Sequence, residues 1–162
     1  MNVLEYEMID ILKRLKDEYG VFEIKAEYEN EGSRQEELCR LKDITSKVGL
    51  PIIMKIGGVE AVTDIYNAIT LGVNGIIAPM AETKFAVSKF LGAINTFVAE
   101  DNRNDIEFAI NVETITCYDN FDDILSLPNI NTLSGVTIGR VDFTSSMGKD
   151  RSFADSDEML KH

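Results

Sequence analysis

The feature that most constrains the fold is a repeated alternation of apolar, strand-like runs with segments of helical periodicity. Five runs rich in β-branched and other apolar residues are separated by segments in which apolar side chains recur every three to four positions. This alternation is typical of the α/β class, in which crossover helices connect parallel strands. The predicted strands span residues 21–29, 51–56, 73–79, 106–113 and 135–141.

Two architectures contain five consecutive βα units. A doubly wound sheet of the flavodoxin type fits a chain of 162 residues well. A (β/α)₈ barrel takes about 250 residues, so five strands would form only part of one. Chain length alone therefore favours the doubly wound sheet. In both cases residues 1–162 are expected to form a single domain, with helix 2–19 before the first strand.

Local signals predict where one crossover helix begins and ends. Ser33 is followed three positions later by Glu36, which is the spacing of a capping box. Gly49, with Pro51 two residues beyond it, is expected to end the same helix. Residues 155–158 resemble the start of one more helix near the end of the chain.

The charge balance excludes several classes of partner. With 28 acidic and 16 basic residues the formal net charge is −12, which argues against binding to nucleic acid or to an anionic membrane surface. No apolar run approaches the ~20 residues needed to span a bilayer. Cys39 and Cys117 fit no metal or redox spacing, and the acidic N-terminus lacks a signal-peptide pattern, so we expect a cytoplasmic protein. The single histidine is His162, which argues against histidine catalysis within this chain.

Two predicted strands each end on a carboxylate. The run from Ile106 ends at Glu113, and the run from Gly135 ends at Asp142. The carboxyl ends of parallel strands meet at one rim, where α/β proteins bind their ligands. Two acids at that rim fit a hard divalent cation such as Mg²⁺ or Mn²⁺. From spacing alone, two solvated acids that cap the following helices are an equally good interpretation.

Three motifs in order carry a resemblance to a known family. The segments Asn111–Thr114, Ile138–Gly148 and Ile76–Thr83 resemble the aldolase/citrate lyase family of the HpcH/HpaI type. The similarity covers roughly residues 21–150. It implies that the fold is a partial (β/α)₈ barrel, of which about five parallel strands with crossover helices are present. It thus favours the barrel over the sheet that chain length suggests.

The resemblance also implies a metal-dependent carbon–carbon lyase. Its members act next to 2-oxo acids, or on acyl-thioesters, and the cation stabilises the enolate left when the bond breaks. By this resemblance Glu113 and Asp142 are the ligands of Mg²⁺ or Mn²⁺. The backbone from Gly139 to Asp142, including Val141, would then face the oxo acid.

Candidate counter-charges for an anionic substrate lie near two glycine turns. Lys55 stands where the family usually has an arginine, and Gly57 can aim a backbone N–H group at a carboxylate or phosphate. A Schiff-base role for Lys55 is conceivable but redundant beside a metal, and a structural pairing with Glu27 or Glu29 is the alternative. Arg140 can bind a substrate carboxylate in bidentate fashion or pair with Glu113 or a nearby loop acid.

The chain departs from the family pattern at the position of its base. Many members carry a Glu-His pair at the end of an early strand, where this chain has Ala26–Glu29. Glu27 and Glu29 lie on the same side of that strand, so whichever faces the rim is a candidate base. Pairing of either acid with Lys25 or Lys55 is the alternative.

Further expectations concern assembly and the alternative functions. The resemblance implies about three more strands, so we expect either a truncated form of a longer chain, which we favour, or completion by another copy as a homo-oligomer. An open barrel leaves a strand edge exposed and favours association. The alternative function is a non-catalytic relative that binds an acidic metabolite as a sensor or interaction protein. A flavodoxin-like response module is disfavoured, because no aspartate stands between Glu27 and Glu31.

Overall fold

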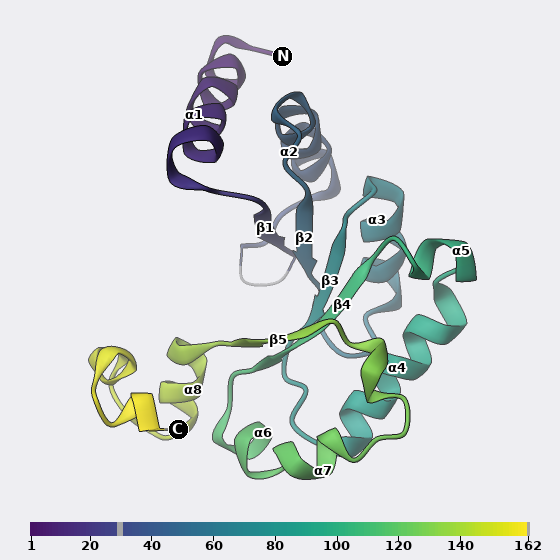
Figure 1. The fold of residues 1–162 in the computed structure, drawn as a ribbon, viewed down its shortest axis with the longest axis vertical. Helices are drawn as coiled ribbons and strands as arrows, with labels where there is room; N and C mark the ends of the chain where they lie inside the picture. The colour runs from purple at the N-terminus through teal and green to yellow at the C-terminus, as the bar shows by residue number, and fades with distance from the viewer. Residues whose placement is uncertain (29–30, 162) are drawn as a thin grey trace.

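The computed structural model describes residues 1–28 and 31–161, and within them five parallel strands form one sheet (Figure 1). Each strand pairs with the next strand along the chain, so the order is β1-β2-β3-β4-β5. The strands are β1 (Ile24–Glu27), β2 (Ile52–Lys55), β3 (Gly75–Ala78), β4 (Glu107–Val112) and β5 (Gly135–Ile138).

This strand order separates the two predicted architectures. A doubly wound sheet reverses direction and places its first strand between two others, as in the flavodoxin order 2-1-3-4-5. A (β/α)₈ barrel adds each strand beside the previous one, as here. The prediction of a partial barrel is confirmed. Within the described residues β1 and β5 are not paired with each other, so the barrel is open.

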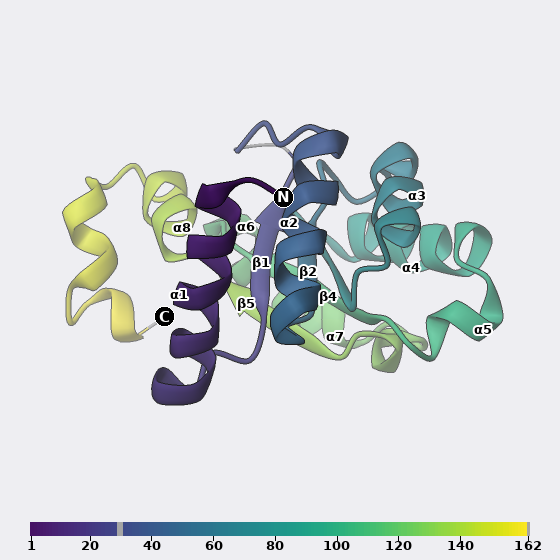
Figure 2. The same cartoon turned by 90° about the horizontal axis from the view of Figure 1, so that it is seen from above.

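The helices surround the outer face of the curved sheet in chain order (Figure 1). Helix α1 precedes the first strand and lies beside α2 (Figure 2). The α-helices are α1 (Val3–Tyr19), α2 (Gln35–Val48), α3 (Val62–Leu71), α4 (Lys84–Phe97), α5 (Glu100–Arg103), α6 (Ile115–Asp119), α7 (Phe121–Leu125) and α8 (Arg140–Ser146). Short 3₁₀ helices are η1 (Ile130–Thr132), η2 (Arg151–Asp155) and η3 (Met159–Lys161). The sequence predicted one more helix from residue 155, and the structure has the two short helices η2 and η3 in that region.

Helix α2 begins one residue later than the capping-box pattern predicts. The backbone N–H of Arg34 donates a hydrogen bond to the Glu37 carboxylate at 3.0 Å, whereas the predicted acceptor was Glu36. The box at Ser33 is therefore wrong by one position, because Glu37 is the acid that lies three residues after the observed N-cap. The helix ends at Gly49 as predicted, with φ of 66°, a left-handed conformation that suits glycine.

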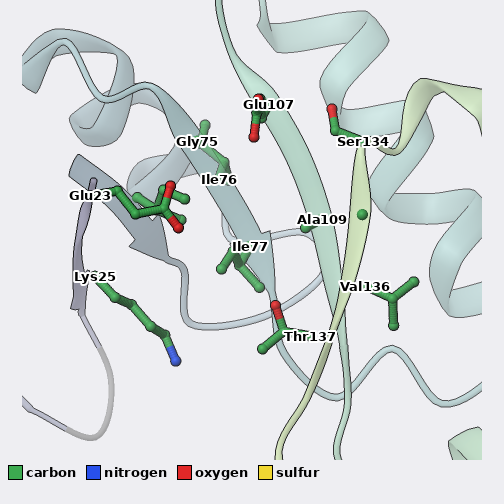
Figure 3. Close-up of a pocket in the computed structure, with 12 residues that line it drawn as sticks. Glu23, Lys25, Gly75, Ile76, Ile77, Glu107, Ala109, Ser134, Val136 and Thr137 are labelled. Atoms are coloured by element: carbon green, nitrogen blue, oxygen red, sulfur yellow. The ribbon is translucent and has the colours of Figure 1, made fainter. Parts of the chain in front are cut away.

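The two faces of the sheet differ in chemistry. Side chains on the outer face, such as Met54, Ile76 and Phe108, are buried beneath the helices and form the main core. The inner, concave face carries Lys25 and Glu107 beside apolar residues (Figure 3). Burial of the outer apolar face is the main stabilising contribution, at roughly 25 cal/mol per Å² removed from water.

The fifth strand differs from its prediction in two respects. It ends at Ile138, and Asp142 lies in the first turn of α8 instead of at the end of a strand. It is also not buried, since Val136 and Ile138 are 46% and 64% exposed. The physical reason is that β5 pairs only with β4 and lacks a covering neighbour on its other side within the described residues.

No helix within the described residues is long and apolar enough to cross a membrane.

Candidate metal and substrate site

Glu113 is a buried carboxylate at the end of β4. It is 2% exposed. Its Oε1 accepts a hydrogen bond from the backbone N–H of Met80 at 3.0 Å, and its Oε2 accepts one from Asn111 Nδ2 at 2.9 Å. Thr114, the next residue, caps α6 by accepting a hydrogen bond from the Cys117 amide at 3.0 Å. The Glu-Thr pair therefore fixes both a carboxylate at the rim and the start of the next helix.

Met80 presents its amide to Glu113 through an unusual backbone conformation. Its φ of 50° is the only positive φ at a non-glycine residue within the described residues. Left-handed backbone at a residue with a Cβ atom costs on the order of 1–2 kcal/mol. The rest of the fold stabilises this strained turn, which follows β3 and directs a fixed donor at the carboxylate.

Gly139 leaves the space that the Glu113 side chain occupies. A Cβ atom built at Gly139 would lie 2.7 Å from Glu113 Cβ and 2.9 Å from Oε2, which is closer than real contacts allow. The amide of Gly139 donates to the Val112 carbonyl at 3.0 Å and continues the pairing of β4 with β5. The predicted role of Gly139 in substrate binding stays a prediction, but its amide is used within the sheet.

Asp142 is half-buried in the first turn of α8, three residues after Gly139. Helix α8 is held against the start of α6 because the Ile115 amide donates to Ser146 Oγ at 2.8 Å. The Tyr118 and Phe143 rings also meet edge to face, with their centroids 6.0 Å apart. The start of α8 lies at the end of β4, the rim that carries Glu113, because the Gly139 amide that precedes the helix pairs with the Val112 carbonyl.

Within the described residues, neither Glu113 nor Asp142 forms an ion pair with a basic side chain. A buried carboxylate without a counter-charge is destabilising unless hydrogen bonds or a cation compensate. The arrangement fits a divalent cation that keeps several water ligands. No group of three His, Cys, Asp or Glu side chains suited to a metal ion occurs in the described part of the chain. Assignment of the metal to Glu113 and Asp142 stays a prediction.

Lys55 and Glu27 form an ion pair on the concave face. They are register partners at the ends of β2 and β1, with 3.4 Å between Lys55 Nζ and Glu27 Oε2. Lys55 is only 6% exposed. The structure therefore brings together two predicted site residues through the structural pairing named above as the alternative. Glu29, the other candidate base, lies outside the described residues.

Gly57 and Arg140 have protein partners. The Gly57 amide donates to Asp64 Oδ2 at 2.7 Å, so it faces a carboxylate of α3. Arg140 is exposed, and its Nη1 donates to Asp155 Oδ1 at 2.7 Å and to the Ala154 carbonyl at 3.3 Å. Val141 follows in the first turn of α8 with an exposed side chain. Substrate binding by these three residues stays a prediction.

The pKa values of Tyr28 and Cys117 are both raised, which makes the two groups less reactive. The Tyr28 hydroxyl donates to Gln35 Oε1 at 3.1 Å, and burial, with Asp64 nearby, raises the pKa of Tyr28 to about 12. The Cys117 thiol donates to the Ala81 carbonyl, and burial, with Glu82 and Glu113 nearby, raises its pKa to about 11. Both groups stay protonated near neutral pH and serve packing and hydrogen bonding.

A cavity of about 280 Å³ lies on the concave face, and Figure 3 shows its lining. It is lined by polar side chains that include Glu23, Lys25 and Thr137, together with apolar residues of β2 to β4. Neither Glu113 nor Asp142 contributes to its lining. The cavity is therefore the open interior of the barrel, below the rim that carries the two carboxylates.

Sequence reasoning missed Asn111 and Met80, the two residues that hold the Glu113 carboxylate. Asn111 lies two residues before Glu113 on the same strand, so the alternation of side chains places both on one face. That spacing was a usable signal. The contact with Met80 crosses from β3 to β4 through a backbone amide, and no residue type in the sequence indicates it.

Several solved structures of known proteins share the fold of this chain. The citrate synthase SbnG superposes with a TM-score of 0.76 at 18% sequence identity, over 96% of this chain and 65% of that one. An HpcH/HpaI aldolase/citrate lyase family protein from Burkholderia cenocepacia J2315 superposes with a TM-score of 0.68 at 13% identity, over 99% and 78%. A Schiff-base-forming fructose-1,6-bisphosphate aldolase reaches 0.51 at 15% identity, over 94% and 62%.

These identities show a common fold, and the chain spans 65% of the length of the citrate synthase. No curated protein matches the chain in sequence. The sequence profile of HpcH/HpaI aldolase/citrate lyase matches residues 28–161, which is most of the chain. Together with the five strands in barrel order, this match shows that the chain belongs to the HpcH/HpaI aldolase/citrate lyase family.

Proposed function

We propose that this chain carries the metal half of a divalent-metal-dependent carbon–carbon lyase that acts on a 2-oxo acid or an acyl-thioester. The single observation that supports this most strongly is the buried Glu113 carboxylate, which two donors fix and no basic side chain neutralises within the described residues. Membership of the aldolase/citrate lyase family supports the reaction class.

Glu113 and Asp142 would hold Mg²⁺ or Mn²⁺, whose preferred ligands are carboxylate and water oxygens. When bound, the cation supplies Lewis-acid stabilisation of the negative charge that develops as the carbon–carbon bond breaks. The Met80 amide and Asn111 orient the Glu113 carboxylate before the cation arrives. Such preorganisation keeps the cost of ordering the ligand low.

Lys55 and Glu27 would supply the polar contacts beside the metal. Their ion pair is nearly buried on the concave face of the sheet. In this proposal, the Lys55 ammonium faces the substrate carboxylate, and Glu27 keeps the ammonium in place and is the candidate base. Arg140 would reach the substrate only after leaving Asp155, and because their pair is exposed, it contributes little to stability and can break.

A second candidate is a relative that binds an acidic metabolite without turnover. The observation that favours it is that Lys55, Gly57 and Arg140 each have a protein acid as partner. A protein that only binds a metabolite needs fewer side chains free of protein partners than an enzyme that also has to catalyse a reaction. The two candidates share the metal and differ in turnover.

The test is calorimetric titration of the chain with Mg²⁺ and Mn²⁺, with and without pyruvate. We expect cation binding that the oxo acid strengthens and that Glu113→Gln and Asp142→Asn each weaken. Lys47→Gln, an exposed substitution in α2, is the matched control. Cation binding that survives both carboxylate substitutions would overturn the proposed site. If the cation binds as expected, an assay of the metal-bound chain for turnover of a 2-oxo acid adduct distinguishes the two candidates: turnover supports the lyase, and binding without turnover supports the binding protein.

A further inference from the structure

The segment after α8 carries an arginine without an acidic partner. Arg151, the first residue of η2, is exposed and forms no ion pair within the described part of the chain. The acid beside it in sequence, Asp150, caps η2 instead, because its Oδ1 accepts a hydrogen bond from the Ser152 amide at 2.9 Å. This hydrogen bond lowers the pKa of Asp150 below its ordinary 3.8. The Arg151 guanidinium is therefore available to an anion from solution.

Arg151 shares a cavity with Arg140. The cavity has a volume of about 640 Å³ and lies between η2 and the start of α8. Its one acidic lining residue is Asp155, which accepts a hydrogen bond from Arg140 Nη1 at 2.7 Å. The side chains of this ion pair are 53% and 80% exposed, so the pair contributes little to stability and breaks easily. The remaining lining residues are Val141, Ser152 and Ala154.

The local charge of this cavity has the opposite sign to that of the whole chain. Two guanidinium groups face one carboxylate in its lining, whereas the chain has a net charge of −12. The field of the whole molecule therefore repels anions. An anion that binds here is held by local contacts with the two arginines.

The backbone fixes both arginines before any ligand arrives. Gly148 has a φ of 68° and reverses the chain after α8, and the next amide, that of Lys149, donates to the Thr144 carbonyl at 3.1 Å. Ala154 is buried, and its carbonyl accepts a hydrogen bond from Arg140 Nη1 at 3.3 Å. Helix η2 is thus anchored against α8, and little ordering of the backbone is needed when an anion binds.

We propose that Arg140 and Arg151 bind a phosphate group in this cavity, either as inorganic phosphate or as a phosphate monoester. The planar guanidinium fork matches phosphate oxygens in bidentate fashion. A phosphate monoester carries about −1.5 to −2 charges near neutral pH and has three acceptor oxygens, so it can engage two arginines at once. A carboxylate has two oxygens, which one arginine already satisfies. The phosphate would replace Asp155 as the partner of Arg140.

The test is calorimetric titration of the metal-free chain with inorganic phosphate and with glycerol 3-phosphate, a simple monoester. We expect binding that Arg151→Gln weakens about 10-fold, because a charge-assisted bidentate contact is lost. Absence of binding by both anions would overturn the inference. Binding that Arg151→Gln leaves unchanged would overturn it as well. The substituted side chain is exposed, so the variant should fold, and thermal unfolding checks this.

A second substitution should act in the opposite direction. Asp155→Asn removes the competing partner of Arg140 and should tighten phosphate binding by up to about fivefold, the most that an exposed ion pair is worth. Weaker binding by this variant would overturn the inference that phosphate takes the place of Asp155.

The matched control is Arg14→Gln. Arg14 is an exposed arginine on α1 that pairs with Glu18 of the same helix, and its substitution removes the same charge as Arg151→Gln does. It should leave phosphate affinity within about twofold, because it lies outside the cavity. A fall equal to that for Arg151→Gln would mean that net charge alone governs binding, and would overturn the inference.

The two anions distinguish the source of the phosphate. Glycerol 3-phosphate that binds at least as tightly as inorganic phosphate supports a monoester as the ligand, and binding of inorganic phosphate alone supports the free anion. The inference goes beyond the proposed metal chemistry and does not depend on it, because the cavity includes neither Glu113 nor Asp142. The titrations contain no metal ion. Absence of phosphate binding would therefore leave the metal site standing, and absence of Mn²⁺ binding would leave the phosphate site standing.

Discussion

Strands β4 and β5 lead to the two carboxylates of the proposed site, Glu113 and Asp142, yet the two strands lie in different surroundings. Strand β4 lies between two neighbours, and its outward side chains Phe108, Ile110 and Val112 are buried. Strand β5 pairs on one side only and exposes Val136 and Ile138. The carboxylate after β4 is thus fixed by the core, whereas the one after β5 depends on α8 and its contact with α6.

The two proposed metal ligands therefore differ in how far the fold preorganises them. Glu113 accepts two hydrogen bonds and fits against Gly139, so its position follows from the folded sheet. Asp142 follows an exposed edge strand by a short turn. Cation binding should therefore order the β5 side more than the β4 side.

The largest expected effect is a difference in stability between variants that truncate one side chain on each strand. Ile110→Ala on β4 should lower the free energy of unfolding by about 2–5 kcal/mol, because the Ile110 side chain is only 1% exposed and its truncation leaves a cavity. Ile138→Ala on β5 should change it by less than about 0.5 kcal/mol. Urea unfolding of both variants measures the difference. Equal losses would mean that β5 is covered in solution, for example by a second copy.

The contact between the two strands is tested by a methyl group at Gly139. Gly139→Ala should cost about 1–3 kcal/mol, because the added Cβ would overlap the Glu113 side chain and force it to move. Gly135→Ala, at the other end of β5, meets no atom within 4 Å and serves as the control. Thermal unfolding measures the stability of each, and calorimetry should show weaker Mn²⁺ binding for Gly139→Ala alone. A Gly139→Ala protein as stable as the control would contradict the close contact.

The strained turn that serves Glu113 is tested by two substitutions of Met80. Met80→Gly should be more stable than Met80→Ala by roughly 1 kcal/mol, because glycine adopts positive φ without steric cost. Both variants remove the same half-exposed side chain, so their difference isolates the backbone. Urea unfolding at a fixed pH is the measurement. Equal stabilities would show that the left-handed conformation is not retained in solution.

The smallest expected effect concerns Glu23, which lies on the concave face directly before β1 and near Glu107 at the start of β4. Burial, and then repulsion from Glu107 on β4, raise the pKa of Glu23 above its ordinary 4.5. A raised pKa means that the folded state favours the protonated acid. Its stabilising contribution is full below pH 4.5 and is lost as the pH rises through the folded-state pKa.

Glu23→Gln should therefore stabilise the chain slightly at pH 7 and lose that advantage below pH 4.5. Thermal unfolding of both proteins across this pH range is the measurement, with the exposed Glu18→Gln on α1 as the control. A stability difference that is the same at both ends of the range would contradict the pKa shift.

The sequence predicted the parts of the molecule that depend on local pattern. Alternating strands and helices, the capping glycine at residue 49 and the carboxylate at the end of β4 all follow from short-range periodicity. The choice between barrel and doubly wound sheet came from the family resemblance, because chain length alone favoured the wrong architecture.

The remaining features depend on tertiary contacts. The partners of Gly57 and Arg140 are Asp64 and Asp155, acids that only the folded chain brings within reach. The exposure of β5 depends on which neighbour the strand has, and residue type does not reveal this. The strand that was predicted to reach Asp142 ends early because the backbone turns into α8 at Gly139.

The one-sided pairing of β5 has a consequence for how the molecule opens. Regions with few buried contacts and singly paired backbone unfold locally before the rest, and their amide hydrogens exchange first with solvent. We expect β5 to separate from β4 first, so that Asp142 is released while Glu113 still accepts hydrogen bonds from its two donors. In such a partly open form the Glu113 side of the proposed site would keep its folded conformation, and the Asp142 side could pair with it again when β5 refolds.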